Sequence, residues 1–301
     1  MTTNTTPSRV TGAASSGAGP GVADPVIHRK IPWPEYVGWA ILALFVVVFV
    51  HNLFTNPNWK WPIVREYLFN PLVLEGLGNT IKLTIVSGIT GTLLGLGIAM
   101  MRLSSSPLLR TVSTTFIGFM RAMPALVLLL LIYFSGALFP SVPIGIPITG
   151  PTFGELPVNT IITQFIAAWL GLTLIMGSHT GEIFRGGVIS VHGGQLEAAK
   201  ALGLPPFQAF VRVVLPQAIR VSIPGLANEL ISLFKNTSLV SIIGYAELLT
   251  VVQAIYGRTY QTVPLLIVAV IWYLVLILIS MAGQRQLEKR FGRGFTRGAH
   301  A

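Results

Sequence analysis

The sequence contains no cysteine and few charged residues. Of its 301 residues, 10% are Asp, Glu, Lys or Arg, whereas a typical soluble domain carries about 25%. Hydrophobic residues make up 52% of the chain, and its mean hydropathy is +0.71. The missing cysteines exclude disulfides and thiolate metal sites. The shortage of charge and the hydrophobic content together indicate an integral membrane protein.

A nucleotide-binding loop is also missing, because no G-x-x-x-x-G-K-[ST] segment occurs in the sequence. The net charge of +10 would suit a nucleic-acid-binding protein. However, the basic residues are scattered between apolar segments and gather beside their ends, which is typical of membrane proteins. We therefore expect contact with a lipid bilayer and none with nucleic acid.

Six apolar segments come close to the length of about 20 residues that a bilayer-spanning helix needs. The third is too long for one straight helix, and Pro124 predicts a kink or a break inside it. The sequence therefore predicts an all-α integral membrane protein with about six transmembrane helices. The segments lie at about residues 36–54, 80–101, 109–139, 158–177, 221–249 and 263–281.

Gly91 and Gly95 form a G-x-x-x-G pair in the second segment. Two small residues at this spacing allow another helix to approach closely. That helix belongs either to the same subunit or to a second copy of the chain, and the pattern alone leaves both open.

Composition divides the chain into four parts. The first residues are rich in Thr, Ser, Gly, Ala and Pro without an apolar run, which predicts disorder. The first apolar segment begins too far from residue 1 for a signal peptide, so we expect it to be retained. The predicted parts are a disordered cytoplasmic tail at 1–32, an extra first helix with an external loop at 33–71, a transmembrane domain at 72–284, and a basic cytoplasmic tail at 285–301.

The basic residues also predict the orientation. With both termini in the cytoplasm, most of the twenty Lys and Arg residues fall on the cytoplasmic side, and only Lys60, Arg65 and Arg258 fall in external loops. The opposite orientation would reverse this bias, contrary to the rule that basic loops stay inside. We therefore expect both termini, and the loop at 193–216, in the cytoplasm.

The loop at 193–216 reads as two short helices joined by a rigid elbow. Residues 195–202 favour a helix, and Gly203 stands where a left-handed helix terminus prefers glycine. Pro205 and Pro206 stop that helix and start a second one, which Pro216 should close. Within the second helix, helical spacing predicts a common face for Phe207, Phe210, Val211 and Val214.

The order of residues in this loop resembles the EAA loop of ATP-binding cassette (ABC) importer permeases. The matching pattern is Glu197-Ala198-Ala199, then Gly203, then Val213 to Pro216. Two further segments are similar to permeases for polar amino acids of the histidine, glutamine and glutamate type. KNTSLVSIIG at 235–244 resembles their K-D-T-S-L segment, and RAMPALV at 121–127 resembles R-G-T-P. The likeness covers about residues 72–290.

This resemblance implies a type I ABC importer permease fold in a bacterial cytoplasmic membrane, with 193–216 as the coupling helix that docks on an ATPase subunit. It implies as partners an ATPase dimer, an external amino-acid-binding protein, a second permease subunit of the same or a homologous kind, and an amino-acid substrate. ATP would be hydrolysed by the partner, and we expect no cofactor, metal or catalytic residue in this chain. The implied coupling residues are Glu197, Ala198, Ala199, Gly203, Leu204 and Pro216.

Polar residues within the apolar segments are the candidates for a translocation path. A charge at mid-bilayer costs about 2.5–3.5 kcal/mol and therefore faces a partner or water. Glu229 and Lys235 are six residues apart and should not pair on one helix face, so the backbone after Lys235 either leaves helical geometry or these groups have other partners. Glu182 and Arg185 could be a simple surface pair, and His179 is a packing or hydrogen-bonding residue more often than a ligand. The candidates are Arg121, Pro124, His179, Glu182, Glu229, Lys235, Asn236, Thr237 and Ser238.

Three hypotheses follow. The main one is the non-enzymatic permease subunit of an ABC importer for amino acids, which works by alternating access. The alternative is a secondary amino-acid transporter driven by an ion gradient, motivated by Glu229 and Lys235 inside the membrane. The third is an intramembrane enzyme built on Ser178 and His179, but adjacent residues of a helix do not face each other and no G-x-S-x-G segment occurs.

Overall fold

The structure is a computed structural model that describes residues 33–145, 152–191 and 193–291. It divides into two units, Met1–Asn56 and Pro57–Ala301. In the first unit, α1 (Trp33–Thr55) is apolar on all sides, and none of its hydrophobic window is buried. A helix that is hydrophobic all round suits a membrane span that faces lipid. The predicted tails at 1–32 and, beyond residue 291, at the C-terminus lie outside the described residues.

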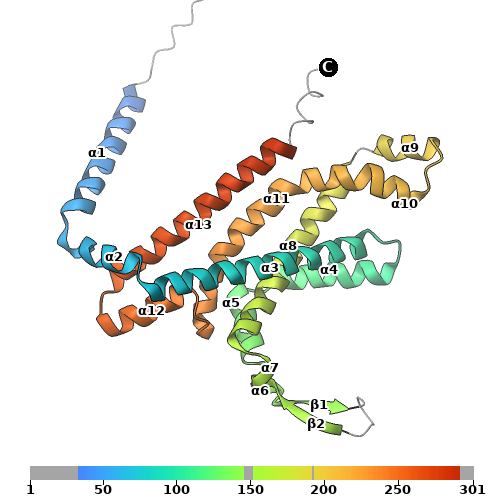
Figure 1. Cartoon of the computed structure of the whole chain (residues 1–301). Coiled ribbons are helices and arrows are strands. Elements are labelled where there is room, and N and C mark those ends of the chain that lie inside the picture. The colour runs from blue at the N-terminus through green and yellow to red at the C-terminus, as the bar shows by residue number, and fades with distance from the viewer. Residues whose placement is uncertain (1–32, 146–151, 192, 292–301) are drawn as a thin grey trace, which may run out of the picture. The chain divides into compact units, whose positions relative to one another are not determined.

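The second unit is a set of helices with one small hairpin (Figure 1). Its α-helices are α2 (Trp61–Leu68), α3 (Pro71–Leu103), α4 (Pro107–Ala122), α5 (Ala125–Tyr133), α6 (Ser135–Leu138), α7 (Val158–Ile161), α8 (Gln164–Ile189), α9 (Gly193–Ala201), α10 (Pro206–Ala209), α11 (Leu215–Asn236), α12 (Leu248–Thr259) and α13 (Thr262–Phe291). Three other helical segments are described in this unit. The segments η1 (Pro57–Trp59) and η3 (Thr237–Ile243) are 3-10 helices, which are wound more tightly than an α-helix, and η2 (Phe210–Val214) is a wider π-helical turn.

The all-α prediction missed one element. Strands β1 (Ser141–Gly145) and β2 (Thr152–Pro157) pair antiparallel in the loop between α6 and α7. Five prolines occur between residues 140 and 157, so no alternating pattern marked these strands as a hairpin. The hairpin lies outside the helical body of the unit (Figure 1).

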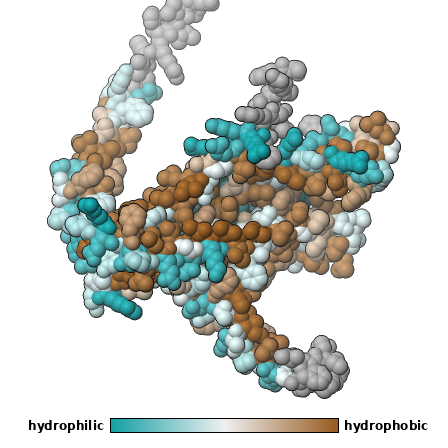
Figure 2. All heavy atoms as spheres, viewed as in Figure 1, coloured by the Kyte–Doolittle hydropathy of each residue, from teal (hydrophilic) through white to brown (hydrophobic). Residues whose placement is uncertain are grey.

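Within the described residues, four helices are long and apolar enough to cross a membrane: Glu35–Thr55, Pro71–Leu103, Pro206–Ile243 and Thr262–Arg290. The pair α4 and α5 would be a fifth, bent by 102°. Pro124 precedes α5 and cannot continue α4, so the predicted break is confirmed. The fourth predicted segment, 158–177, corresponds to α8, which has 26 residues but is not among these candidate spans. The count of six spans therefore stays a prediction. Hydrophobic residues cover the middle of α3, α11 and α13, and hydrophilic residues gather toward the ends (Figure 2).

Two predicted segment boundaries were wrong. The segment at 158–177 becomes helical as α8 only at Gln164, because the hydroxyl of Thr163 caps that helix by accepting from the N–H of Ile166 at 3.3 Å. The segment at 221–249 is not one helix, because α11 gives way to η3 after Asn236 and Gly244 turns the chain with a φ of 75°. The departure from α-helical geometry after Lys235, one of the two alternatives left open by the sequence, therefore occurs.

The centre of the unit is the close contact between α3 and α8. A Cβ added at Gly91 would lie 2.7 Å from the Cβ of Met176, and one added at Gly95 would lie 2.0 Å from the hydroxyl oxygen of Thr180. That hydroxyl donates to the carbonyl oxygen of Gly91 at 3.1 Å. The G-x-x-x-G pair therefore serves packing within the subunit, which decides between the two possibilities left open by the sequence.

Two apolar cores lie at different levels of the helices. One joins α3, α5, α8, α11 and η3 and includes Leu83, Leu129, Leu172, Leu233 and Val240. The other joins α2, α3, α12 and α13 and includes Val64, Val73, Leu248, Val252, Leu265 and Val268. The second core fixes α12 against the beginnings of α3 and α13.

Glu247 is a fully buried carboxylate that caps α12. Its Oε1 accepts from the N–H and the hydroxyl of Thr250 at 2.7 and 2.9 Å. Its Oε2 accepts from the N–H of Leu249 at 2.9 Å and from the hydroxyl of Tyr273 at 2.7 Å. A buried carboxylate is tolerated when such donors replace water. Glu247 therefore ties α12 to α13, a role that nothing in the sequence pattern singled out.

Replacing Gly95 should destabilise the fold. Gly95→Val places side-chain atoms against Thr180 and against the backbone nitrogen of Gly181, which would lie 2.8 Å from the Cβ. Overpacking of this kind costs about 1–3 kcal/mol, so the midpoint of thermal unfolding in detergent should fall. The matched control is Gly97→Val on the same helix, where an added Cβ meets no atom within 4 Å. Equal midpoints for the two variants would contradict the contact.

Glu247→Gln should also lower the unfolding midpoint. The amide keeps the shape of the carboxylate but replaces one acceptor oxygen by a group that only donates, which leaves buried donors unpaired at a cost of about 2–3 kcal/mol. Glu75→Gln makes the same change of charge at an exposed position of α3 and serves as the control. The interpretation fails if both substitutions shift the midpoint alike.

Candidate functional site

The first half of the loop at 193–216 has the predicted helix and elbow. Helix α9 ends with Gly203 in the left-handed region, at a φ of 74°. The N–H of Gly203 donates to the carbonyl oxygen of Lys200 at 2.9 Å, and that of Leu204 donates to Ala199 at 3.1 Å. This pair of bonds is the Schellman motif, which glycine adopts without strain. The roles of Gly203 and Leu204 in the elbow therefore follow from backbone geometry.

The predicted coupling residues of α9 lie on two sides of the helix. Glu197 and Ala198 are exposed, whereas Ala199 is 3% exposed. Helix α9 packs against α10 and η2, and the small side chain of Ala199 permits that approach. Glu197 and Ala198 are thereby presented to the outside of the loop.

The second half of the loop differs from the prediction. Pro216 does not close the unit but lies in the first turn of α11, and one helical course runs from Pro206 to Asn236. A proline ring clashes with the carbonyl four residues before it. The π turn η2 lies at this place, and the N–H of Leu215 donates to the carbonyl oxygen of Phe210, five residues earlier. The wider turn lets the helix continue past Pro216.

The π turn also changes which side chains share a face. Of the four residues predicted on one face, Val214 is buried and Phe210 is partly buried, but Phe207 is 77% and Val211 38% exposed. The prediction was wrong for these two because a π turn shifts the register of a helix by one residue. Phe207 and Leu202, which is 82% exposed, give the loop an apolar surface. Exposed apolar groups beside the elbow suit a binding surface for another protein.

A cluster of charged side chains lies along α8. Glu182 forms ion pairs with Arg102 of α3 and with Arg185 of α8. The Nη2 of Arg185 lies 3.0 Å from the Oε2 of Glu182. The three side chains are 21%, 25% and 31% exposed. The predicted pair of Glu182 and Arg185 is confirmed, but it is more than a surface pair. Arg102, which was not among the site residues predicted from the sequence, joins the cluster and connects α3 to α8.

His179 and Glu229 form a second polar link, between α8 and α11. The Nδ1 of His179 lies 2.7 Å from the Oε1 of Glu229. Glu229 thus has a partner on another helix, which is the other alternative that its spacing from Lys235 left open. Ser178 is fully buried and donates to the carbonyl oxygen of Ile175 at 2.7 Å. Ser178 and His179 therefore bond to different groups and do not form the pair that an intramembrane enzyme would need.

The remaining path candidates do not join this cluster. Arg121 is exposed in the last turn of α4, and Lys235 is exposed in the last turn of α11. Neither forms an ion pair with a carboxylate of the described residues. Beyond α11, Thr237 is buried and donates to Phe234, whereas Ser238 donates to Lys235. Asn236 is the last residue of α11, so these residues surround the change from α-helix to 3-10 helix.

Comparisons with known proteins agree with this geometry. Residues 91–293 match the family model described as the binding-protein-dependent transport system inner membrane component. The arginine transport system permease protein ArgU of Corynebacterium glutamicum is 35% identical over 95% of this chain and 88% of its own. The probable amino-acid ABC transporter permease protein YckA of Bacillus subtilis is 35% identical over 75% of this chain and 95% of its own.

Solved structures give the same result. A crystal structure of an amino acid ABC transporter with histidines is 34% identical, covers 74% of this chain and 95% of its own, and has a TM-score of 0.64. An inward-facing MetNI methionine ABC transporter shares the fold, with a TM-score of 0.59. It is 19% identical and covers 73% of this chain and 96% of its own.

These matches confirm the resemblance to amino-acid ABC permeases and do not favour the ion-driven alternative. The match to ArgU extends beyond residues 72–290, the range in which the sequence motifs were found. The chain is therefore a multi-pass transport subunit that belongs to the family of binding-protein-dependent transport system inner membrane components.

Proposed function

We propose that residues 193–216 are the surface on which an ABC ATPase drives this permease during the import of amino acids. The elbow at Gly203, with exposed Glu197, Ala198, Leu202 and Phe207 around it, is the observation that carries the proposal. A mechanical input needs a continuous connection to the membrane. The helical course from Pro206 to Asn236, which has Pro224 within α11, supplies one.

The partners are an ATPase dimer, an external binding protein and a second permease subunit, either identical or homologous. ATP acts through the ATPase, and this chain carries no catalytic residue and no cofactor. Both termini lie in the cytoplasm. Figure 1 supports this orientation, since α9, α10 and the basic end of α13 lie on one side of the unit and α2, α12 and the hairpin on the other.

The substrate is a polar amino acid, and Glu229 is the charged residue of α11 that contacts it. Its side chain is 17% exposed and bonds to His179 of α8. Lys235 lies six residues further on, which places it on another face of α11. A carboxylate attracts a cation, and together with the arginine system of a relative this favours a cationic amino acid.

Gly203→Pro should uncouple ATP hydrolysis from uptake. Proline cannot adopt a φ of 74° and lacks the N–H that bonds to Lys200. In proteoliposomes with the ATPase inside and the binding protein outside, ATP hydrolysis should persist while uptake falls at least about tenfold, the equivalent of about 1.4 kcal/mol.

The matched control is Gly193→Pro, which puts proline at the first position of α9, where it is tolerated. Normal membrane insertion of both variants is checked first. Wild-type coupling in Gly203→Pro would overturn the role of the elbow. Uptake driven by an ion gradient without any ATPase would overturn the proposed function as a whole.

Glu229→Gln should weaken the import of arginine more than that of glutamine. Removing the carboxylate removes an attraction for a side-chain cation but leaves the neutral substrate unaffected. The change in the ratio of the two uptake efficiencies should be about tenfold, or about 1.4 kcal/mol. The control is Glu75→Gln, at an exposed position of α3. An equal fall for both amino acids would show that Glu229 only holds α8 through His179.

A further inference from the structure

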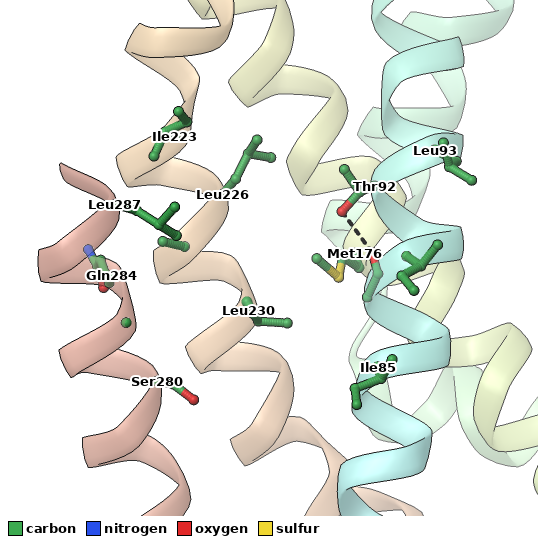
Figure 3. Close-up of a pocket in the computed structure, with 14 residues that line it drawn as sticks. Ile85, Thr92, Leu93, Met176, Ile223, Leu226, Leu230, Ser280, Gln284 and Leu287 are labelled. Atoms are coloured by element: carbon green, nitrogen blue, oxygen red, sulfur yellow. Dashed lines mark hydrogen bonds between the residues drawn. The ribbon is translucent and has the colours of Figure 1, made fainter. Parts of the chain in front are cut away.

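An apolar groove runs between α3, α11 and α13, apart from the charged cluster. Its volume is about 670 Å³, and Met176 of α8 contributes to its lining. Figure 3 shows Leu226 and Leu230 of α11 directed toward α3, with Leu287 and Gln284 on the side of α13. Very few polar groups line it. It therefore offers almost nothing to a zwitterionic amino acid and suits a hydrocarbon chain.

The groove lies beside the middle of α3 and α11 and near the C-terminal end of α13. The Nε2 of Gln284 donates to the Oδ1 of Asn228 at 3.1 Å, which fixes the register of the antiparallel helices α13 and α11. From Gln284 the chain runs toward Arg290, and from Asn228 it runs back toward Arg220. At 1.5 Å per residue, these two arginines lie about 9 and 12 Å beyond the Gln284 bridge, in the same direction. Both helices therefore carry a guanidinium beyond the same end of the groove.

This end of the groove is positively charged. Arg220, Arg285, Lys289 and Arg290 are all exposed. None of them forms an ion pair with an acidic side chain in the part of the chain that the structure describes. The carboxylate of Glu288 also lies here and accepts from Gln284 at 2.8 Å. Four positive side chains and one carboxylate give this end of the groove a net positive charge, which attracts anions.

We propose that this groove binds an anionic glycerophospholipid of the membrane. One acyl chain lies between α3 and α13, and the phosphate contacts Arg220 and Arg290. Basic pockets between transmembrane helices on the cytoplasmic side bind anionic lipid headgroups in this way, and long arginine side chains reach the interface. The proposal rests on the orientation given above, in which the basic end of α13 is cytoplasmic.

The test measures lipid binding to the purified full-length chain by native mass spectrometry. The probes are phosphatidylglycerol and phosphatidylcholine with identical acyl chains, added in steps. The wild-type chain should retain phosphatidylglycerol preferentially. The double variant Arg220→Gln and Arg290→Gln should lower its affinity about thirtyfold, since each cation near the surface contributes about 1 kcal/mol.

The control variant is Arg65→Gln with Arg258→Gln, which removes two exposed cations from α2 and α12, on the side opposite to the basic end of α13 (Figure 1). It should bind phosphatidylglycerol as the wild type does. Equal binding of the two lipids, or an equal loss in both double variants, would overturn the site. The lipid-binding measurement uses neither ATP nor an amino-acid substrate. Its result therefore does not depend on whether the proposed transport function is correct.

A second measurement locates the acyl chain. Because the chain has no cysteine, Ala227→Cys in the groove and Val270→Cys on the exposed face of α13 can each carry a single fluorophore. Phosphatidylglycerol brominated on its acyl chains should quench the probe at 227 more strongly than brominated phosphatidylcholine, without such a difference at 270. Crosslinking through Cys at 227 to a second copy would assign the groove to a subunit interface instead.

Discussion

The close approach of α3 to α8 is the contact on which the rest of the structure depends. Gly91 and Gly95 present no side chain to Met176 and Thr180, so the two backbones lie near enough for a hydroxyl to bond across them. In a membrane the hydrophobic effect does not drive helices together, so packing and such bonds must do so. With α8 fixed in this way, its charged residues meet Arg102 on one side and α11 on the other.

Two polar links join three helices. Glu182 forms ion pairs with both Arg102 and Arg185, which leaves one positive charge in the cluster, and Glu229 bonds to His179. A half-buried charge in a membrane protein needs such partners. The same groups make the relative position of α3, α8 and α11 sensitive to any movement of α11, which is the helix that continues from the coupling loop.

That loop combines a rigid elbow with a continuous helical course. Gly203 allows the chain to turn within two residues, and Ala199 lets α9 pack on the start of the second helix. The π turn before Pro216 then keeps the course unbroken into α11. At the other end, the change to a 3-10 helix after Asn236 ends this course, and the second apolar core together with the Glu247 network holds α12.

The sequence by itself determined the membrane class, the helical character, the break at Pro124 and the left-handed terminus at Gly203. These depend on composition, hydrophobic length and the backbone limits of proline and glycine, which act locally. The spacing of the EAA-like residues also identified the family without any knowledge of the fold.

The tertiary structure alone decided the partners of the buried polar groups. Arg102 joined Glu182, His179 joined Glu229, and Glu247 became the cap that ties α12 to α13. It also decided that the helix passes Pro216 through a π turn, which exposed Phe207 and Val211 against expectation. The physical reason is the same in each case: residues far apart in the chain are brought together by helix packing, and no local pattern records which donor will satisfy a given carboxylate.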